Sequence, residues 1–146
     1  MLGTIIRRVV GFESLTDPLK AGPIHVVDGD DVTWSGKRYR LAGYDAPEIQ
    51  NFRSRIDRRL ERRRGYQAKR RLRELLENAL LVDLIPLKKR DKFGRELAQL
   101  MVDGKDVAAI ALAERWGCPY RVRKDIDWGD PKSNFDDGLP LPDGSG

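Results

Sequence analysis

Five carboxylates lie within 21 residues in the first third of the chain, and their spacing is its strongest chemical signal. Three follow an apolar run in Val-Val-Asp-Gly-Asp-Asp-Val, and two close a later run in Tyr-Asp-Ala-Pro-Glu. They are Asp28, Asp30, Asp31, Asp45 and Glu48. Clustered acids repel one another unless protons or a cation compensate, and a hard cation with oxygen ligands is the natural occupant. The alternative is that Asp-Gly is turn chemistry and Asp-Ala-Pro-Glu a loop.

Two arginines accompany these acids. Arg40 precedes Asp45 by five residues on the same predicted strand, and Arg95 follows the turn Asp-Lys-Phe-Gly at the start of another. Guanidinium groups bind phosphate through two parallel hydrogen bonds and stay charged at any working pH. Together with a carboxylate-held cation and Glu48 they suit phosphodiester hydrolysis. The cation and the arginines would stabilise charge on phosphorus, while the glutamate orients or deprotonates water.

The chain has one histidine and one cysteine, His25 and Cys118. That count excludes an intramolecular disulfide, a cysteine-based zinc site and an imidazole-rich zinc or copper site. A metal must therefore be held by oxygen, which favours Ca²⁺ and leaves Mg²⁺ or Mn²⁺ open. We expect His25 to face outward from a strand and Cys118 to serve as a small hydrophobe.

The chain carries a formal net charge of +5 and has a pI of about 9.5, which favours an anionic partner. The positive charge is concentrated between residues 53 and 73, where ten arginines and Lys69 stand against Asp57 and Glu61. This stretch is typical of a phosphate-facing surface. The alternative is a solvated, charged helix face.

The segments around these residues predict an α+β architecture. Residues 22–34 and 37–41 alternate as strands about the turn Ser35-Gly36, and residues 80–87 and 96–102 form strands across the turn at 91–94. Helical spacing covers 58–79 and 107–116. The apolar face of the first helix is formed by Ala68, Leu72, Leu75, Leu76 and Ala79. The order of strands, helix, strands and helix indicates helices packed on a small antiparallel barrel.

With 146 residues the chain suits one compact domain, which we place at 21–125. Residues 1–20 form an arm with one short strand, and 126–146 form an irregular tail rich in Asp, Pro and Gly. No segment approaches the roughly 20 apolar residues that span a bilayer, and the N-terminal run is too short for a signal-peptide core. We therefore expect a cytoplasmic monomer with no membrane contact and no obligate protein partner, or a secreted or periplasmic one if a longer N-terminus was removed.

The order of five motifs resembles the staphylococcal nuclease, or thermonuclease, family. The motifs are Val-Asp-Gly-Asp, Arg-Leu-Ala-Gly-Tyr-Asp-Ala-Pro-Glu, a helix ending in Glu-Asn-Ala, Asp-Lys-Phe-Gly-Arg and Asp-Gly-Lys. The likeness extends from about residue 22 to residue 120. It implies a five-stranded OB-type barrel with two or three packed helices. It also implies a Ca²⁺-dependent nuclease that hydrolyses DNA and RNA and leaves 3′-phosphate ends.

The resemblance also implies how a metal would be bound. Asp30, Asp45 and the main-chain carbonyl of Ala46 would be the ligands, and Asp28 would lie just outside them. Ala46 and Asp31 stand where the family usually has threonine. A carbonyl ligand survives the first change but a neighbouring hydroxyl does not, and the second adds negative charge beside the metal.

For the reaction itself, the resemblance implies that Glu48 acts on the attacking water and that Arg40 and Arg95 grip the scissile phosphate. Lys92 and Tyr120 would contact the rest of the substrate. A non-catalytic OB-fold module that only binds nucleic acid remains the alternative. Such a module has no chemical reason to keep the reactive positions, so the sequence favours the nuclease.

Overall fold

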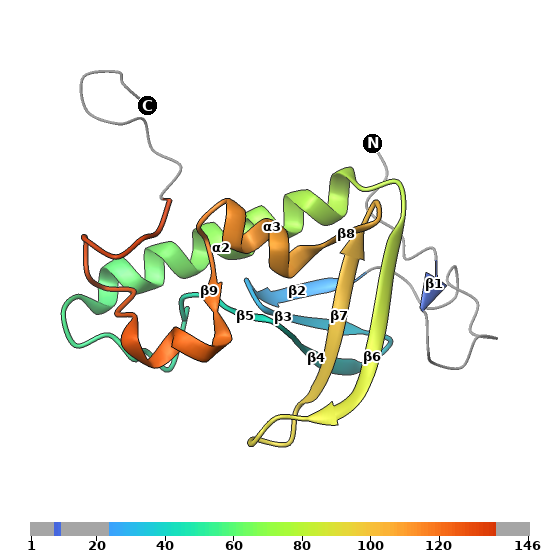
Figure 1. Ribbon diagram of the computed structural model, residues 1–146, viewed down its shortest axis with the longest axis horizontal. Coiled ribbons are helices and arrows are strands. Elements are labelled where there is room, and N and C mark those ends of the chain that lie inside the picture. The colour runs from blue at the N-terminus through green and yellow to red at the C-terminus, as the bar shows by residue number, and fades with distance from the viewer. Residues whose placement is uncertain (1–7, 10–23, 137–146) are drawn as a thin grey trace.

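The strands and helices follow the predicted order in the computed structural model, which describes residues 8–9 and 24–136 (Figure 1). The main strands are β2 (His25–Asp28), β3 (Asp31–Trp34), β4 (Lys37–Leu41), β6 (Val82–Arg90) and β7 (Glu96–Val102). Shorter strands are β1 (Arg8–Val9), β5 (Tyr44–Asp45), β8 (Lys105–Asp106) and β9 (Cys118–Pro119). The helices are α2 (Arg58–Asn78), α3 (Val107–Ala113) and the 3₁₀ helix η1 (Tyr120–Asp125). These elements confirm the predicted α+β class with five main strands and three helices.

One sheet has the order β1-β6-β7-β4-β3-β2, with β8 beside β7, and β5 pairs separately with β9. Among the described residues these ladders form an open path. Ser35 and Gly36, both with positive φ, make the tight turn between β3 and β4. The β3–β4 register places Asp31 opposite Arg40, and the parallel β4–β7 register places Arg40 opposite Leu97. The sheet thereby brings the start of β7, next to Arg95, to the same end as Arg40.

The helix α2 begins and ends within one residue of its predicted bounds. Asp57 caps its N-terminus by accepting hydrogen bonds from the amides of Arg59 and Leu60. Its apolar face packs into the core through Ala68, Leu72 and Leu76, and the helix contacts β2. The prediction for this helix and its buried face is confirmed.

The helix α3 ends at Ala113, three residues before the predicted end at 116. Arg115 adopts a positive φ of 61°, which is incompatible with a continuing α-helix. The turn folds Trp116 into the core, where its ring packs edge-on against Tyr44 with centroids 5.7 Å apart. The predicted helix end was wrong because the apolar residue at position 116 matches the helical period but fills the core beyond the end of the helix.

The segment predicted as an irregular tail contains no helix or strand over residues 126–136, but it packs tightly. Trp128 and Phe135 are buried, with ring centroids 5.6 Å apart. Arg64 of α2 is also buried and donates hydrogen bonds to the carbonyls of Trp128 and Asp130 and to Ser133 Oγ, at 2.7–2.9 Å. These residues belong to the core, whereas the predicted arm outside β1 and residues 137–146 lie outside the described part.

The predictions for the single histidine and the single cysteine are confirmed. His25 is exposed on β2, and Cys118 is buried. Burial raises the pKa of the Cys118 thiol to about 11, so the thiol stays protonated and unreactive. None of the helices in the described part of the chain is long and apolar enough to cross a membrane.

Replacing Phe135 by alanine tests whether the last described segment stabilises the fold. The substitution removes a buried ring that packs on Trp128 and lies 5.2 Å from the guanidinium of Arg64. We expect a loss of about 3 kcal/mol in the free energy of unfolding, measured by urea denaturation. Lys132→Ala, which changes an exposed residue of the same segment, is the control; equal losses in the two variants would contradict the assignment.

Candidate active site

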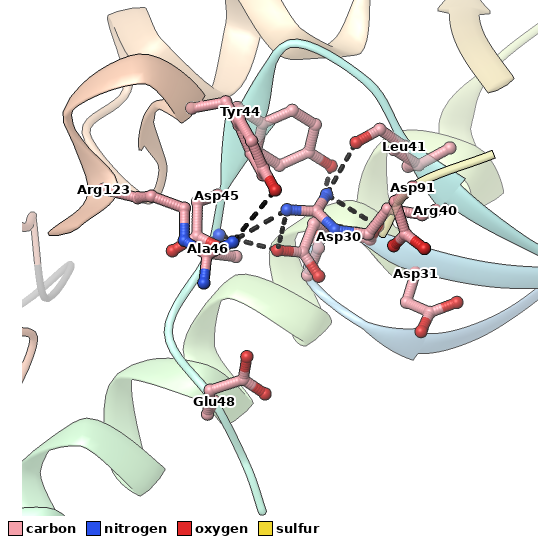
Figure 2. Close-up of polar contacts among 12 residues, drawn as sticks. Asp30, Asp31, Arg40, Leu41, Tyr44, Asp45, Ala46, Glu48, Asp91 and Arg123 are labelled. Carbon is pink, nitrogen blue, oxygen red and sulfur yellow. Dashed lines mark hydrogen bonds and ion pairs between the residues drawn. The ribbon is translucent and has the colours of Figure 1, made fainter. Parts of the chain in front are cut away.

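The two acidic groups of the sequence converge around one guanidinium. Asp30 lies in the turn between β2 and β3, and Asp45 ends β5. Arg40 Nη2 lies 3.3 Å from Asp30 Oδ2 and 3.3 Å from Asp45 Oδ1 (Figure 2). Arg40 Nη1 donates to the carbonyl of Leu41 at 2.6 Å, which fixes the plane of the group. All three charged side chains are buried, so the carboxylates depend on this arginine for compensation.

Asp30 is held by the backbone of the other acidic loop. The amide of Ala46 donates to Asp30 Oδ2 at 2.8 Å. Burial raises the pKa of Asp30 to about 6, although the charge of Arg40 opposes the shift. The hydroxyl of Tyr44 donates to the carbonyl of Gly29 at 2.5 Å, which ties the two loops together a second time.

Glu48 lies apart from the group formed by Arg40, Asp30 and Asp45 (Figure 2), and its Oε1 atom lies 3.9 Å from Arg53 Nη2. Its side chain is half-buried, and desolvation together with the charge of Asp30 raises its pKa to about 7, while Arg53 opposes the rise. A carboxylate with a pKa near neutrality is suited to take a proton from water.

The predicted arginine of the β6–β7 turn approaches from the other side. Arg95 Nε donates to Asp91 Oδ2 at 2.7 Å, and Arg95 Nη1 lies 3.8 Å from Asp31 Oδ2. Asp31 is buried, and Arg38 Nη2 pairs with it at 2.7 Å, whereas Asp31 Oδ1 has no hydrogen-bond partner in the described part of the molecule. Asp28 is half-buried, and desolvation and the charge of Asp31 raise its pKa.

These side chains surround a cavity of about 450 Å³. Its lining comprises Asp28, Asp30, Arg38, Arg40, Asp45, Glu48, Asn51, Arg53, Phe93, Arg95 and Arg123. Two predicted substrate residues, Lys92 and Tyr120, line a neighbouring pocket of about 270 Å³ instead, which shares Arg40 with the cavity. The structure thus brings the predicted metal and catalytic residues together and places the predicted substrate contacts beside them.

Several residues of the cavity belong to none of the motifs in the sequence. Arg38 lies two positions from Arg40 on the same strand, so the alternation of side chains could have found it. Arg53 was counted only as one charge of the basic stretch. Its Nη2 atom pairs with Asp45 Oδ2 at 2.6 Å, which makes it the second guanidinium on that carboxylate.

A buried glutamate of α2 holds the loop that carries Glu48 and Arg53. Glu61 is only 1% exposed. Its Oε2 atom accepts a hydrogen bond from the amide of Glu48 at 3.3 Å, and its Oε1 atom accepts from the amides of Arg53 and Ser54 at 3.1 and 2.9 Å. Charge-assisted bonds of this kind are stronger than neutral ones. No short motif marks such a residue, because the partners are backbone groups of a distant loop.

Close approach between α2 and both acidic loops depends on two glycines. A Cβ at Gly29 would lie 2.6 Å from the Cβ of Ala68. A Cβ at Gly65 of the helix would lie 2.8 Å from the carbonyl oxygen of Glu48. The helix therefore serves as the common support for the first acidic turn and for the loop after the second.

The donor chemistry of the cavity fits a hard divalent cation. Asp30 and Asp45 each place one oxygen 3.3 Å from the same nitrogen atom of Arg40, so a cation bound by both carboxylates would compete with that guanidinium, and the carbonyl of Ala46 is the further oxygen expected. Within 24–136, no group of three or more His, Cys, Asp or Glu side chains is arranged to hold a metal. A cation bound at Asp45 Oδ2 would have to displace Arg53, whose side chain is 35% exposed.

The raised pKa values predict how stability depends on pH when divalent cations are chelated. Asp30 and Glu48 bind protons more tightly in the folded than in the unfolded chain, so stability should fall as the pH rises from about 4 to about 7. We expect the melting temperature to drop by roughly 5 °C between about pH 5 and pH 8. Saturating Ca²⁺ should flatten the curve, because a bound cation favours ionised carboxylates. A slope unchanged in Asp30→Asn would contradict this cause.

Replacing Glu61 by alanine should release the loop that carries Glu48. Three backbone amides lose their acceptor, so we expect about 3 kcal/mol lower stability and more rapid amide hydrogen exchange at residues 48–54. Glu77→Ala, an exposed residue of the same helix, is the control. If exchange in the loop does not change, Glu61 does not hold it.

One comparison with known proteins gives a match. A family model described as "Staphylococcal nuclease homologue" matches residues 38–123, more than half of the chain. No protein in a search of curated sequences matches the chain closely enough to count as a relative. The matched span contains Arg40, Asp45, Glu48 and Arg95, while Asp30 precedes it and reaches it through the contact with Arg40.

Proposed function

Because the chain belongs to the staphylococcal nuclease homologue family, we propose that it is a metal-dependent nuclease that hydrolyses phosphodiester bonds of DNA and RNA. Membership confirms the predicted OB-type fold and indicates a function related to nucleic acids. The proposal adds the reaction, the cation and the products, which we take to be 3′-phosphate ends. We further propose Ca²⁺ as the cation, with Mg²⁺ and Mn²⁺ as the ions to compare, and a monomer as the active form.

The observation that supports the proposal best is the guanidinium of Arg40 between Asp30 and Asp45, on the wall of a cavity that also contains Glu48 and Arg95. This arrangement combines oxygen donors for a cation, a carboxylate with a pKa near neutrality and a guanidinium open to an anion. Each group has one part in phosphodiester hydrolysis.

The exposure of each side chain in the cavity indicates the role that we assign to it. Glu48, half-buried with a pKa of about 7, holds the attacking water and accepts its proton. Arg95 is partly exposed and has donors left beyond its bond to Asp91, so it can bind a phosphate oxygen as charge accumulates there. Arg40 is more deeply buried, and its first task is to hold Asp30 and Asp45 together by pairing with both. A divalent cation held by Asp30, Asp45 and the Ala46 carbonyl would polarise the phosphoryl group.

Removing either of two side chains should abolish cleavage without unfolding the protein. Glu48→Gln loses the proton acceptor and Arg95→Ala loses a phosphate donor, so each should lower the rate by about 10²–10⁴-fold. The assay is Ca²⁺-supplemented digestion of single- and double-stranded DNA and RNA with end-group analysis, before and after chelation. Matched controls are Glu77→Gln and Arg115→Ala, at exposed positions near the end of α2 and after α3, which should keep full activity.

Three outcomes would count against the nuclease proposal. The first is cleavage that survives chelation of divalent cations, and the second is Glu48→Gln protein with an unchanged rate. The third is tight binding of nucleic acid without cleavage under any divalent cation, which would favour the non-catalytic binding module instead.

A further inference from the structure

A second hollow adjoins the catalytic cavity. It has a volume of about 460 Å³ and lies between the loop at 53–55 and the segment 123–128. Its lining comprises Arg53, Ser54, Arg55, Glu61, Arg123, Lys124, Asp125, Ile126, Asp127 and Trp128. Two of these residues, Arg53 and Arg123, also line the catalytic cavity. The two hollows, here called the catalytic cavity and the side cleft, therefore meet along two arginines.

Two of the three carboxylates in the side cleft accept hydrogen bonds from groups of the protein itself. Asp127 accepts hydrogen bonds from Ser54 Oγ at 2.6 Å, from the amide of Arg55 at 3.0 Å and from the amide of Gly129 at 2.8 Å. Glu61 accepts three further amides from the loop. Asp125 is exposed to solvent. Hydrogen bonds from the backbone compensate the two inner carboxylates, so these are weak competitors for a cationic side chain.

The cationic side chains of the side cleft fall into two groups, one with partners inside the protein and one without an ion pair. Arg53 pairs with Asp45 at 2.6 Å, and Arg123 donates to the hydroxyl of Tyr120 at 3.0 Å. Arg55 and Lys124 are exposed, and within the described chain neither side chain forms an ion pair with a carboxylate. By contrast, each arginine of the catalytic cavity that was predicted from sequence is paired with an aspartate. The side cleft thus holds two positive charges whose compensation must come from solvent or from a ligand.

We propose that the side cleft binds a neighbouring phosphate of the same nucleic-acid strand whose scissile phosphate occupies the catalytic cavity. This inference rests on the proposed function and specifies how the substrate extends. Arg95, Arg53 and Arg123 line the catalytic cavity, and Arg53 and Arg123 line the side cleft together with Arg55 and Lys124. Cationic groups are therefore present in both hollows and where they meet, which suits a strand that carries more than one phosphate. Arg55 offers a planar fork for two phosphate oxygens, and Lys124 a point charge.

The occupant is the backbone of the strand rather than a base. Trp128 is 4% exposed, so its ring is not available for stacking. The cleft offers charge and hydrogen-bond donors but no open aromatic face. A phosphate contact of this kind adds affinity without sequence preference.

A salt titration measures the predicted contacts directly. In Glu48→Gln protein, which keeps the substrate intact, binding of a labelled single-stranded oligonucleotide should weaken as salt rises. Each phosphate contact to a single strand contributes about 0.7 to the slope of log K against log salt. Arg55→Gln with Lys124→Gln removes the contact to one phosphate and should therefore lower that slope by about 0.7. The matched control, Arg115→Gln with Lys105→Gln, removes the same two residue types at exposed positions after α3 and on β8, outside the basic stretch 53–73, and should leave the slope unchanged.

Cleavage kinetics separate a side subsite from general damage to the active site. With Glu48 intact, the double variant Arg55→Gln/Lys124→Gln should raise KM for an oligonucleotide roughly tenfold. Its loss of kcat/KM should be at least several-fold smaller on a dinucleotide, which has a single phosphodiester. Thermal denaturation shows whether both double variants are folded, and inorganic phosphate serves as a competitor that tests for a small-anion site.

Each result bears on one proposal. An unchanged salt slope, an equal loss on dinucleotide and oligonucleotide, or an equal effect of the control pair would overturn the side subsite. Inorganic phosphate that binds the cleft as tightly as the oligonucleotide would also overturn it, in favour of a site for small anions. Should the protein bind strands through Arg55 and Lys124 yet cleave nothing, the nuclease proposal falls while the subsite stands.

Discussion

The guanidinium of Arg40 is buried together with two carboxylates whose negative charge it compensates. It pairs with Asp30 and Asp45 and donates to a backbone carbonyl, so its own donors are well satisfied. Removing one partner of such a buried group typically costs about 3–5 kcal/mol. The β3–β4 hairpin, the turn before β3 and the short strand β5 must all keep their relative positions for this group to form. The geometry of the cavity is therefore a consequence of charge compensation in the core.

Helix α2 packs against the loops that carry Asp30 and Glu48, through residues that do not line the cavity themselves. Gly65 lets the helix approach the backbone of Glu48, and Ala68 lies against Gly29. Glu61 holds the amides of the intervening loop. One helix thus positions the loop that carries Glu48 and the turn that carries Asp30, while its exposed face carries many of the arginines that give the chain its basic character.

Much of this organisation follows from local sequence patterns. Alternation and turn residues indicated the strands, the 3.6-residue period indicated α2, and the clustering of acids that include Asp30, Asp45 and Glu48 indicated oxygen ligands for one cation. What the sequence could not show depends on distant partners. Arg64 follows two exposed arginines in the sequence, but it is buried because carbonyl groups of the last described segment accept hydrogen bonds from its guanidinium. Composition indicated an irregular segment there, correctly for 126–136, and concealed the packing of Trp128 and Phe135.

The link between Ser54 and Asp127 has a consequence for the order of assembly. These residues are separated by 73 positions, yet their hydrogen bond helps to fix the loop that follows Glu48. Contacts of such long sequence separation form late in folding, because closing the intervening chain costs entropy first. During synthesis the sheet and α2 can therefore associate while the loop still lacks its distal anchor. The loop after Glu48 gains this anchor only once Asp127 has been synthesised, so any shorter translation product lacks it.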